Sequence, residues 1–202
     1  MGKVYPCKPS TSSCTATTIS SANMYTIWMK SLVVNGNGYT VYDSNGKVVY
    51  RIDNYDIKCR NEVYLMDLQG NVLCTISRKK LLRFGVWDGY KGCGPKAKNQ
   101  KPWFEVTNSC KFLKKDSEYR VIIGSDENQS TNFYKIGEMN KQKSEFKIIN
   151  GQGTIVAEVK QKLSACGVTL GEDVLSLKVE PSVDQSFIMA LVAVHGLLNN
   201  RM

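Results

Sequence analysis

The sequence is poor in the residues and patterns that hydrolases, nucleotide-binding enzymes and zinc proteins use. Among its 202 residues there is one histidine, His195, and the seven cysteines form no Cys-x-x-Cys pair. Because a structural zinc site needs about four clustered ligands, we expect no metal and no cofactor. Neither a Gly-x-Ser-x-Gly elbow nor a P-loop occurs, and His195 adjoins an apolar run, as a partly buried helix-end residue would. We therefore expect no catalytic residues and no enzymatic activity.

Signals for secretion and membrane insertion are also missing. Residues 1–6 carry no apolar stretch, so we expect no signal peptide. The apolar run Phe187–Leu198 has 12 residues, whereas a membrane-spanning helix needs about 20. An odd number of cysteines disfavours a disulfide framework. These features predict reduced, mostly buried thiols, no transmembrane span and a cytoplasmic location.

The sequence does contain the residue pattern of an all-β domain. Residues 1–22 are rich in Ser, Thr, Cys and Pro without periodicity, and we interpret them as a flexible N-terminal tail. Residues 23–202 are then a single domain, in which segments rich in Val, Ile, Tyr and Phe alternate with Gly, Asn, Asp and Lys. The expected strands are 24–34, 39–43, 48–54, 63–66, 72–78, 84–90, 103–111, 118–123, 132–139, 145–149, 155–161 and 173–179.

One turn pattern recurs. Asp-x-x-Gly-x-Val occurs at positions 43 and 67, each time between two expected strands. Hairpin turns favour Asp, Asn and Gly, so turn chemistry alone explains the recurrence, and an internal repeat is the alternative.

The C-terminal residues do not follow the strand pattern of the rest of the domain. Asp184 or Ser186 precedes the uncharged run from Phe187 to Val194 and is suited to cap a helix. A helix that is apolar on every face must be surrounded by protein. About eight strands make a barrel that its own side chains fill, and twelve leave a wider hole. A helix about 10–12 Å across would fill it. We therefore predict a mainly β fold, a closed antiparallel barrel of roughly twelve strands around a central C-terminal hydrophobic helix.

Four segments, in this order, resemble the plant LURP-one-related proteins: Val48–Tyr55, Leu65–Leu73, Thr75–Lys80 and Ser186–Val192. The similarity extends over about residues 24–202. It implies the tubby-like C-terminal fold, shared with tubby proteins and phospholipid scramblases, and a kinship with membrane-tethered transcription factors. For some plant members it also implies a role in pathogen defence. His195 and Gly196 stand where this family often has an acidic residue, which leaves the end of the helix open.

Positive charge is concentrated in one part of the chain. The net charge is +9, and residues 74–120 hold twelve cations against four acids, interleaved with Trp87, Tyr90, Trp103 and Phe104. Such a field attracts phosphates of lipid headgroups or nucleic acid. The one long helix expected is apolar throughout, so we expect no direct DNA binding. The candidate headgroup-binding residues are Arg78, Lys79, Lys80, Arg83, Lys91, Lys96 and Lys98.

Two functional classes remain open. The first is a monomeric, non-catalytic module that binds anionic phospholipid through a basic rim. Tubby proteins bind phosphoinositides in this way, and the resemblance extends that expectation to this chain, peripheral at the plasma membrane or nuclear on release. The second is a scaffold that binds an unidentified protein partner in plant defence or stress signalling, without lipid binding. In that case the positive charge has no ligand and only keeps the rim of the barrel solvated.

Overall fold

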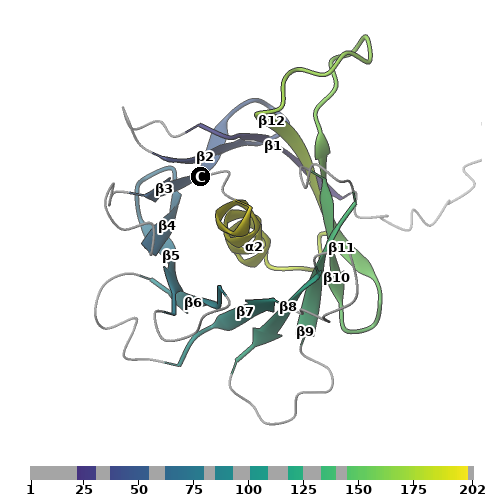
Figure 1. Ribbon diagram of the computed structural model, residues 1–202. Helices are drawn as coiled ribbons and strands as arrows, with labels where there is room; N and C mark the ends of the chain where they lie inside the picture. The colour runs from purple at the N-terminus through teal and green to yellow at the C-terminus, as the bar shows by residue number, and fades with distance from the viewer. Residues whose placement is uncertain are drawn as a thin grey trace, which may run out of the picture.

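The computed structural model describes residues 22–30, 37–54, 62–79, 85–92, 101–108, 118–124, 133–139 and 145–199. Within these ranges twelve strands surround one long helix, as Figure 1 shows in a view along the barrel. The strands are β1 (Asn23–Trp28), β2 (Asn37–Tyr42), β3 (Val48–Asn54), β4 (Glu62–Asp67), β5 (Val72–Arg78), β6 (Trp87–Lys91), β7 (Phe104–Asn108), β8 (Glu118–Ile123), β9 (Phe133–Glu138), β10 (Phe146–Asn150), β11 (Ile155–Gln161) and β12 (Val174–Val179), and the helix is α2 (Gln185–Leu198).

The strands form one closed antiparallel barrel. Each strand pairs with its neighbours in sequence, and β1 closes the barrel on β12, with Asn23 opposite Val179 and Trp28 opposite Val174. The predicted fold class is therefore confirmed. The expected first strand was too long, because β1 ends at Trp28. Residues 1–21 of the expected tail lie outside the described residues, so its division from the domain stays a prediction.

Antiparallel order sends the connections alternately to two ends of the barrel. We call the end with the turns at residues 43–47, 67–71 and 150–154 the turn end. We call the other end the arm end, because there β11 and β12 are joined by residues Lys162–Asp173, which we call the arm. Figure 1 shows the arm projecting beyond the barrel wall, near the label of β12.

The recurring turn pattern has a local cause. Asp43 Oδ1 accepts hydrogen bonds from the backbone N–H groups of Asn45 and Lys47, both at 2.8 Å, and Gly46 adopts a φ of +76°. The turn at residues 67–71 uses an aspartate in the same way, and the turn at 150–154 uses an asparagine. Because the third turn achieves this without the Asp-x-x-Gly-x-Val pattern, turn chemistry is sufficient to explain the recurrence.

Helix α2 fills the barrel. Asp184 caps its start by accepting hydrogen bonds from the N–H groups of Ser186 and Phe187 at 2.9 and 3.3 Å. All ten residues from Phe187 to Gly196 are buried, as the apolar sequence requires. At the turn end the Phe187 ring packs against Trp103, Phe104 and Tyr134, with centroids 5.4, 5.6 and 5.2 Å away.

The sequence did not decide whether the helix ends at His195 and Gly196, and the structure shows that it continues beyond them. It passes through His195 and Gly196 and ends at Leu198. A Cβ atom at Gly196 would lie 1.3 Å from Tyr39 Oη, so the helix backbone lies directly against the side chain of a β2 residue. Glycine at position 196 is what allows this approach.

Candidate functional site

The inside of the barrel belongs to the core. His195 is 2% exposed, which is more buried than the sequence suggested. Its ring stacks on Phe146 with centroids 3.7 Å apart, Tyr119 lies edge-on at 6.4 Å, and Nε2 is 3.1 Å from Asn199 Nδ2. Because α2 and these aromatic rings occupy the interior, a ligand would have to bind at the outer wall or at an end of the barrel.

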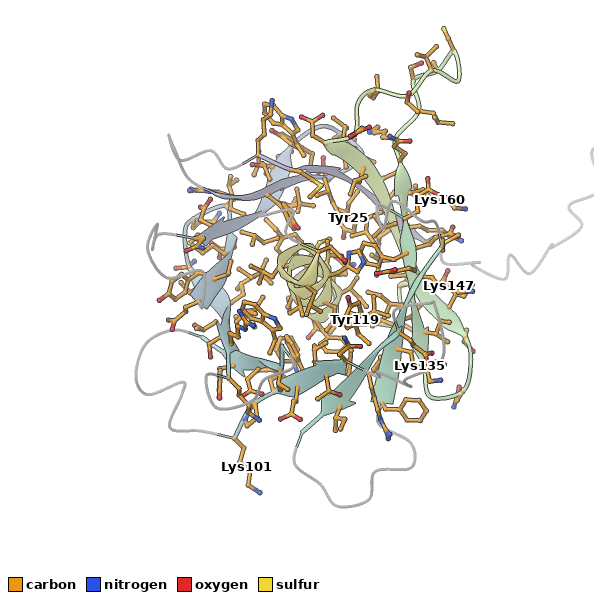
Figure 2. The ribbon with its side chains drawn as sticks, viewed as in Figure 1. Tyr25, Lys101, Tyr119, Lys135, Lys147 and Lys160 are labelled. Carbon is orange, nitrogen blue, oxygen red and sulfur yellow. The ribbon has the colours of Figure 1, made fainter. Side chains whose placement is uncertain are left out.

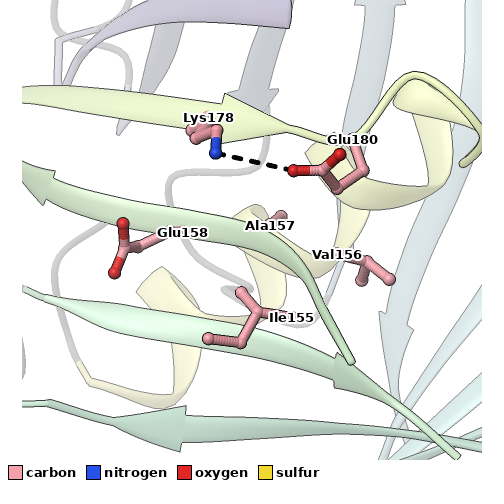
Figure 3. A pocket seen from close by; sticks show the side chains of 6 residues that line it. All are labelled: Ile155, Val156, Ala157, Glu158, Lys178 and Glu180. Carbon is pink, nitrogen blue, oxygen red and sulfur yellow. Dashed lines mark ion pairs between the residues drawn. The ribbon is translucent and has the colours of Figure 1, made fainter. Parts of the chain in front are cut away.

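One hollow lies beside β11 and β12 near the turn end (Figure 3). Its volume is about 150 Å³, which is small beside the roughly 300–1,000 Å³ of ordinary ligand pockets. Lys178 Nζ and Glu180 Oε1 form an ion pair at 3.6 Å along one side of it. Glu158 pairs with Lys160 at 2.9 Å, so the charged groups of the hollow already have partners. This hollow is poorly suited to a phosphorylated headgroup. Its lining residues are Ile155, Val156, Ala157, Glu158, Lys178 and Glu180.

The candidate headgroup-binding residues do not all come together. Arg78 pairs with Trp87 and Cys74 with Lys91 across β5 and β6, so Arg78 lies at the arm end and Lys91 at the turn end. A flat bilayer against one end of the barrel would therefore contact only one of these two cations. Lys80, Arg83, Lys96 and Lys98 lie outside the described residues.

Lys79 is engaged in the fold. Its Nζ lies 3.4 Å from Oδ1 of Asp88 and also pairs with Glu105. Asp88 is only 2% exposed, and its Oδ2 accepts a hydrogen bond from Tyr90 Oη at 3.2 Å. Burial raises the pKa of Asp88, and the charge of Lys79 opposes that rise. Burial would lower the pKa of Lys79, but the two carboxylates outweigh it and raise that pKa. The charge of Lys79 is thus matched by Asp88 and Glu105 and is a poor choice for a headgroup ligand.

This arrangement predicts a pH-dependent cost of removing Lys79. The Lys79→Met variant should lose about 1–3 kcal/mol of unfolding free energy at pH 7, because a buried carboxylate loses its counter-charge. The folded-state pKa of Asp88 is already raised and should rise further in the variant. A group with a raised folded pKa stabilises the fold at low pH and loses that contribution as the pH rises through the folded pKa. The deficit should therefore shrink as the pH falls through the pKa of Asp88, which urea unfolding at a series of pH values measures.

Lys135→Met is the matched control. Lys135 Nζ lies 3.2 Å from Glu118 Oε1, but both side chains are nearly half exposed, at 43% and 47%, so its loss should cost less than about 1 kcal/mol at every pH. Equal losses of unfolding free energy in the two variants, or a Lys79→Met deficit that does not change with pH, would show that the charge of Lys79 does not stabilise the buried Asp88 carboxylate.

The other two described candidates differ in their surroundings. Arg78 is exposed and has no acidic partner among the described residues, so its charge is available. Lys91 Nζ lies 4.7 Å from the centre of the Trp103 ring, in a cation–π contact. Trp103 in turn packs on Phe104 and Phe187, so Lys91 covers the aromatic cluster at the turn end.

Sequence reasoning missed a second basic surface, which we call the side-wall patch: Arg120, Lys135 and Lys147 on β8, β9 and β10. Arg120 and Lys135 are directly opposite each other in the register, and Lys135 also pairs with Glu118 at 3.2 Å. Figure 2 shows Lys135 and Lys147 pointing away from the barrel. The basic stretch recognised in the sequence, residues 74–120, ends at Arg120 and so does not include Lys135 and Lys147. The outward parity of neighbouring strands would have been needed to find this patch.

The described parts of the chain contain no candidate metal site and no candidate membrane-spanning helix. No group of three or more His, Cys, Asp or Glu side chains there is placed to hold a metal ion. Of the two cysteines described, Cys74 is buried, which raises the pKa of its thiol to about 12, and Cys166 is exposed. Within the same ranges, no helix has the length and apolar character to cross a bilayer.

Comparison with known proteins gives a consistent family match. Residues 23–196 match the family model described as LURP-one-related. The chain is 44% identical over 176 residues to Protein LURP-one-related 4 and 45% identical over 180 residues to Protein LURP-one-related 11, both of Arabidopsis thaliana. These alignments cover 86% and 87% of this chain and 77% of each relative. An X-ray structure of an Arabidopsis thaliana protein superposes with a TM-score of 0.61 at 16% identity, covering 89% of this chain and 92% of that one, a likeness of fold.

Proposed function

This chain belongs to the LURP-one-related family, and from that premise we propose that it is a non-catalytic, peripheral membrane-binding module. Its ligands are anionic phospholipid headgroups, phosphoinositides included, and it takes them at the arm end of the barrel. The proposal includes the kinship with tubby proteins and phospholipid scramblases that the resemblance implies. It also includes a location at the plasma membrane, with release to the nucleus.

The observation that supports this function best is an asymmetry of charge between the two ends. Counted in the sequence, the six segments that join strands at the arm end contain twelve cations and five acids, whereas the six at the turn end contain four cations and five acids. Nine of the twelve arm-end cations lie outside the described residues. From this count we infer that the arm end is the more basic end. The arm-end connections are residues 29–36, 55–61, 79–86, 109–117, 139–145 and 162–173, and the turn-end connections are residues 43–47, 68–71, 92–103, 124–132, 151–154 and 180–184.

Such an asymmetry orients the protein on an anionic surface. Each Lys or Arg near the surface contributes about 1 kcal/mol to binding, and the attraction falls off within a Debye length of about 10 Å at 0.1 M salt. Four to six cations in contact would give reversible binding that salt weakens. Arg78, exposed at this end and without a described acidic partner, is the described side chain most available for it.

The test compares two arginines in vesicle co-sedimentation. Wild-type protein should sediment with vesicles that contain phosphatidylserine or a phosphoinositide, and not with pure phosphatidylcholine. Arg78→Glu should weaken this binding about tenfold, since it reverses one charge at the basic end. Arg120→Glu makes the same change of charge on the side wall, where the Arg120 guanidinium lies 5.3 Å from the Phe133 ring, and should leave binding unchanged. An absence of wild-type binding to any vesicle refutes the proposal, and a larger effect of Arg120→Glu would place the contact on the side wall.

A second candidate is a protein-interaction scaffold in plant defence or stress signalling. The side-wall patch favours it, because Arg120 and Lys135 are opposed in the register and an acidic protein surface would complement their charge. Under this function the wild type would not bind vesicles at all.

A further inference from the structure

We propose that the arm, residues Lys162–Asp173, is a membrane-inserting hairpin whose apolar side chains enter the headgroup and upper acyl region of the bilayer. This inference rests on the proposed function, since a bilayer is its target. It adds a hydrophobic contact to the electrostatic one.

The arm exposes more apolar surface than its length explains. Seven large hydrophobic side chains are exposed in the described part of the chain, and three of them, Leu163, Val168 and Leu170, belong to the arm. They are 54%, 64% and 52% exposed, higher than each of the other four. Figure 1 shows that the arm projects away from the barrel, which agrees with the exposure of these side chains. A concentration of this kind marks a surface that another phase or molecule covers.

The charges of the arm suit an anionic bilayer. From Lys162 to Gly171 the only charged side chain is that of Lys162, which is positive. The acids of the arm, Glu172 and Asp173, stand at its base. There Asp173 is paired with Lys30 at 3.5 Å and accepts a hydrogen bond from Trp28 Nε1 at 3.2 Å. Insertion of the arm would therefore bury no carboxylate.

Several backbone groups of the arm are hydrogen-bonded within the arm, which favours entry into an apolar medium. The N–H of Ser164 donates to the carbonyl of Val168 at 2.7 Å, and the N–H of Leu170 donates to the carbonyl of Lys162 at 3.0 Å. The N–H of Gly167 bonds the carbonyl of Ser164 at 2.9 Å, and the N–H of Val168 bonds Ser164 Oγ at 3.1 Å. Backbone groups that are paired internally enter a bilayer at much lower cost than unpaired ones.

The distribution of apolar side chains over the two faces favours a bilayer over a protein surface. Leu163 and Thr169 form a cross-strand bridge, so they share one face of the hairpin. By alternation along each strand, Val168 and Leu170 share the opposite face. A protein docked on one face would leave the other face exposed to water. A bilayer surrounds an inserted hairpin and covers both faces.

The arm is also held in place at its base. The N–H of Met29 donates to the carbonyl of Asp173 at 2.8 Å, and the N–H of Lys162 donates to the carbonyl of Val174 at 3.0 Å. These bonds hold the base of the arm to β1 and β12. The arm is therefore ordered before it contacts a bilayer, and binding does not have to order it. Lower ordering entropy means that more of the contact energy appears as affinity.

The first test removes apolar groups from the arm. The double variant Leu163→Ser/Leu170→Ser should bind phosphatidylserine-containing vesicles about thirtyfold more weakly than wild type, because two half-exposed leucines no longer enter the bilayer. Leu68→Ser is the matched control. Leu68 is 44% exposed, but it lies in a turn at the opposite end of the barrel, and its loss should leave binding unchanged.

The outcomes separate this inference from the proposed function. Loss of binding in Arg78→Glu together with wild-type binding in the double leucine variant would refute the inserting arm and leave the electrostatic function standing. Equal effects of Leu68→Ser and the double variant would also refute it. No vesicle binding by wild type would refute both. A wild-type dimer that the double variant converts to monomer would show that a second copy, and not a bilayer, covers the arm.

The second test reports insertion directly. Cys166 is exposed in the arm, and an environment-sensitive fluorophore on its thiol should shift to the blue and brighten when anionic vesicles are added. The labelled protein should retain Cys74, which is buried, and carry serine at the five cysteines outside the described residues. The control places the label at Leu68→Cys with Cys166→Ser, and its emission should not change. An unchanged spectrum at Cys166 on vesicles that the protein demonstrably binds would overturn the inference.

Discussion

Replacing Leu191 with aspartate should prevent the protein from folding. Leu191 is fully buried in α2 and belongs to the hydrophobic core cluster of the barrel. An unpaired carboxylate there would cost several kcal/mol in addition to the lost packing, and a domain has only about 5–15 kcal/mol of stability in total. Circular dichroism and urea unfolding of the purified variant measure the loss.

An exposed leucine supplies the control for that experiment. Leu170→Asp introduces the same carboxylate at a side chain that is half exposed in the arm, and it should leave unfolding within about 0.5 kcal/mol of wild type. A Leu191→Asp protein that is soluble, cooperative and as stable as Leu170→Asp would show that α2 does not fill the barrel.

Gly196→Ala should be strongly destabilising although alanine is the better helix former. Helix propensity alone favours alanine by about 1 kcal/mol. The new Cβ, however, would lie 1.3 Å from Tyr39 Oη and 2.6 Å from its Cζ, so the helix or β2 must move. Overpacking of a rigid core costs about 1–3 kcal/mol or more, and we expect a net loss of at least about 2 kcal/mol.

A double-mutant cycle identifies the contact responsible. Tyr39→Phe removes the hydroxyl oxygen that lies nearest to the new Cβ, so Gly196→Ala should cost less in that background than in wild type. Gly137→Ala is the control, because a Cβ at Gly137 would meet nothing within 4 Å. Strict additivity of the Tyr39 and Gly196 changes in urea unfolding would contradict close packing between α2 and β2.

The fold could be predicted because its signals are local. The uncharged apolar run from Phe187 to Val194, preceded by a capping Asp or Ser, is typical of a buried core helix. The Asx-x-x-Gly turns are typical of antiparallel hairpins. The end of the helix could not be predicted. Gly196 resembles a helix stop in sequence, and only the position of Tyr39 on β2, 157 residues away, explains why glycine continues the helix there.

The candidate site was less predictable because it depends on register and on partners distant in sequence. Residues 74–120 are one basic stretch in sequence, but antiparallel pairing of β5 and β6 places Arg78 and Lys91 at opposite ends. Lys79 finds its counter-charges on Asp88 and Glu105, on two other strands. The arm was hidden for a related reason. Its leucines are no different in sequence from core leucines, and only the projecting hairpin makes them exposed.

We propose that the arm end of the barrel is the surface that contacts an anionic membrane. Hydrogen–deuterium exchange of the full chain, at low salt, with neutral or phosphatidylserine-containing vesicles, tests it most directly. Amides of the arm and of the β5–β6 connection should become protected with anionic vesicles only, while the turns at residues 43–47, 67–71 and 150–154 exchange as in solution. Protection of those turns, or of β8 to β10 at the side-wall patch, or no protection anywhere, would show that the arm end is not the membrane-binding surface.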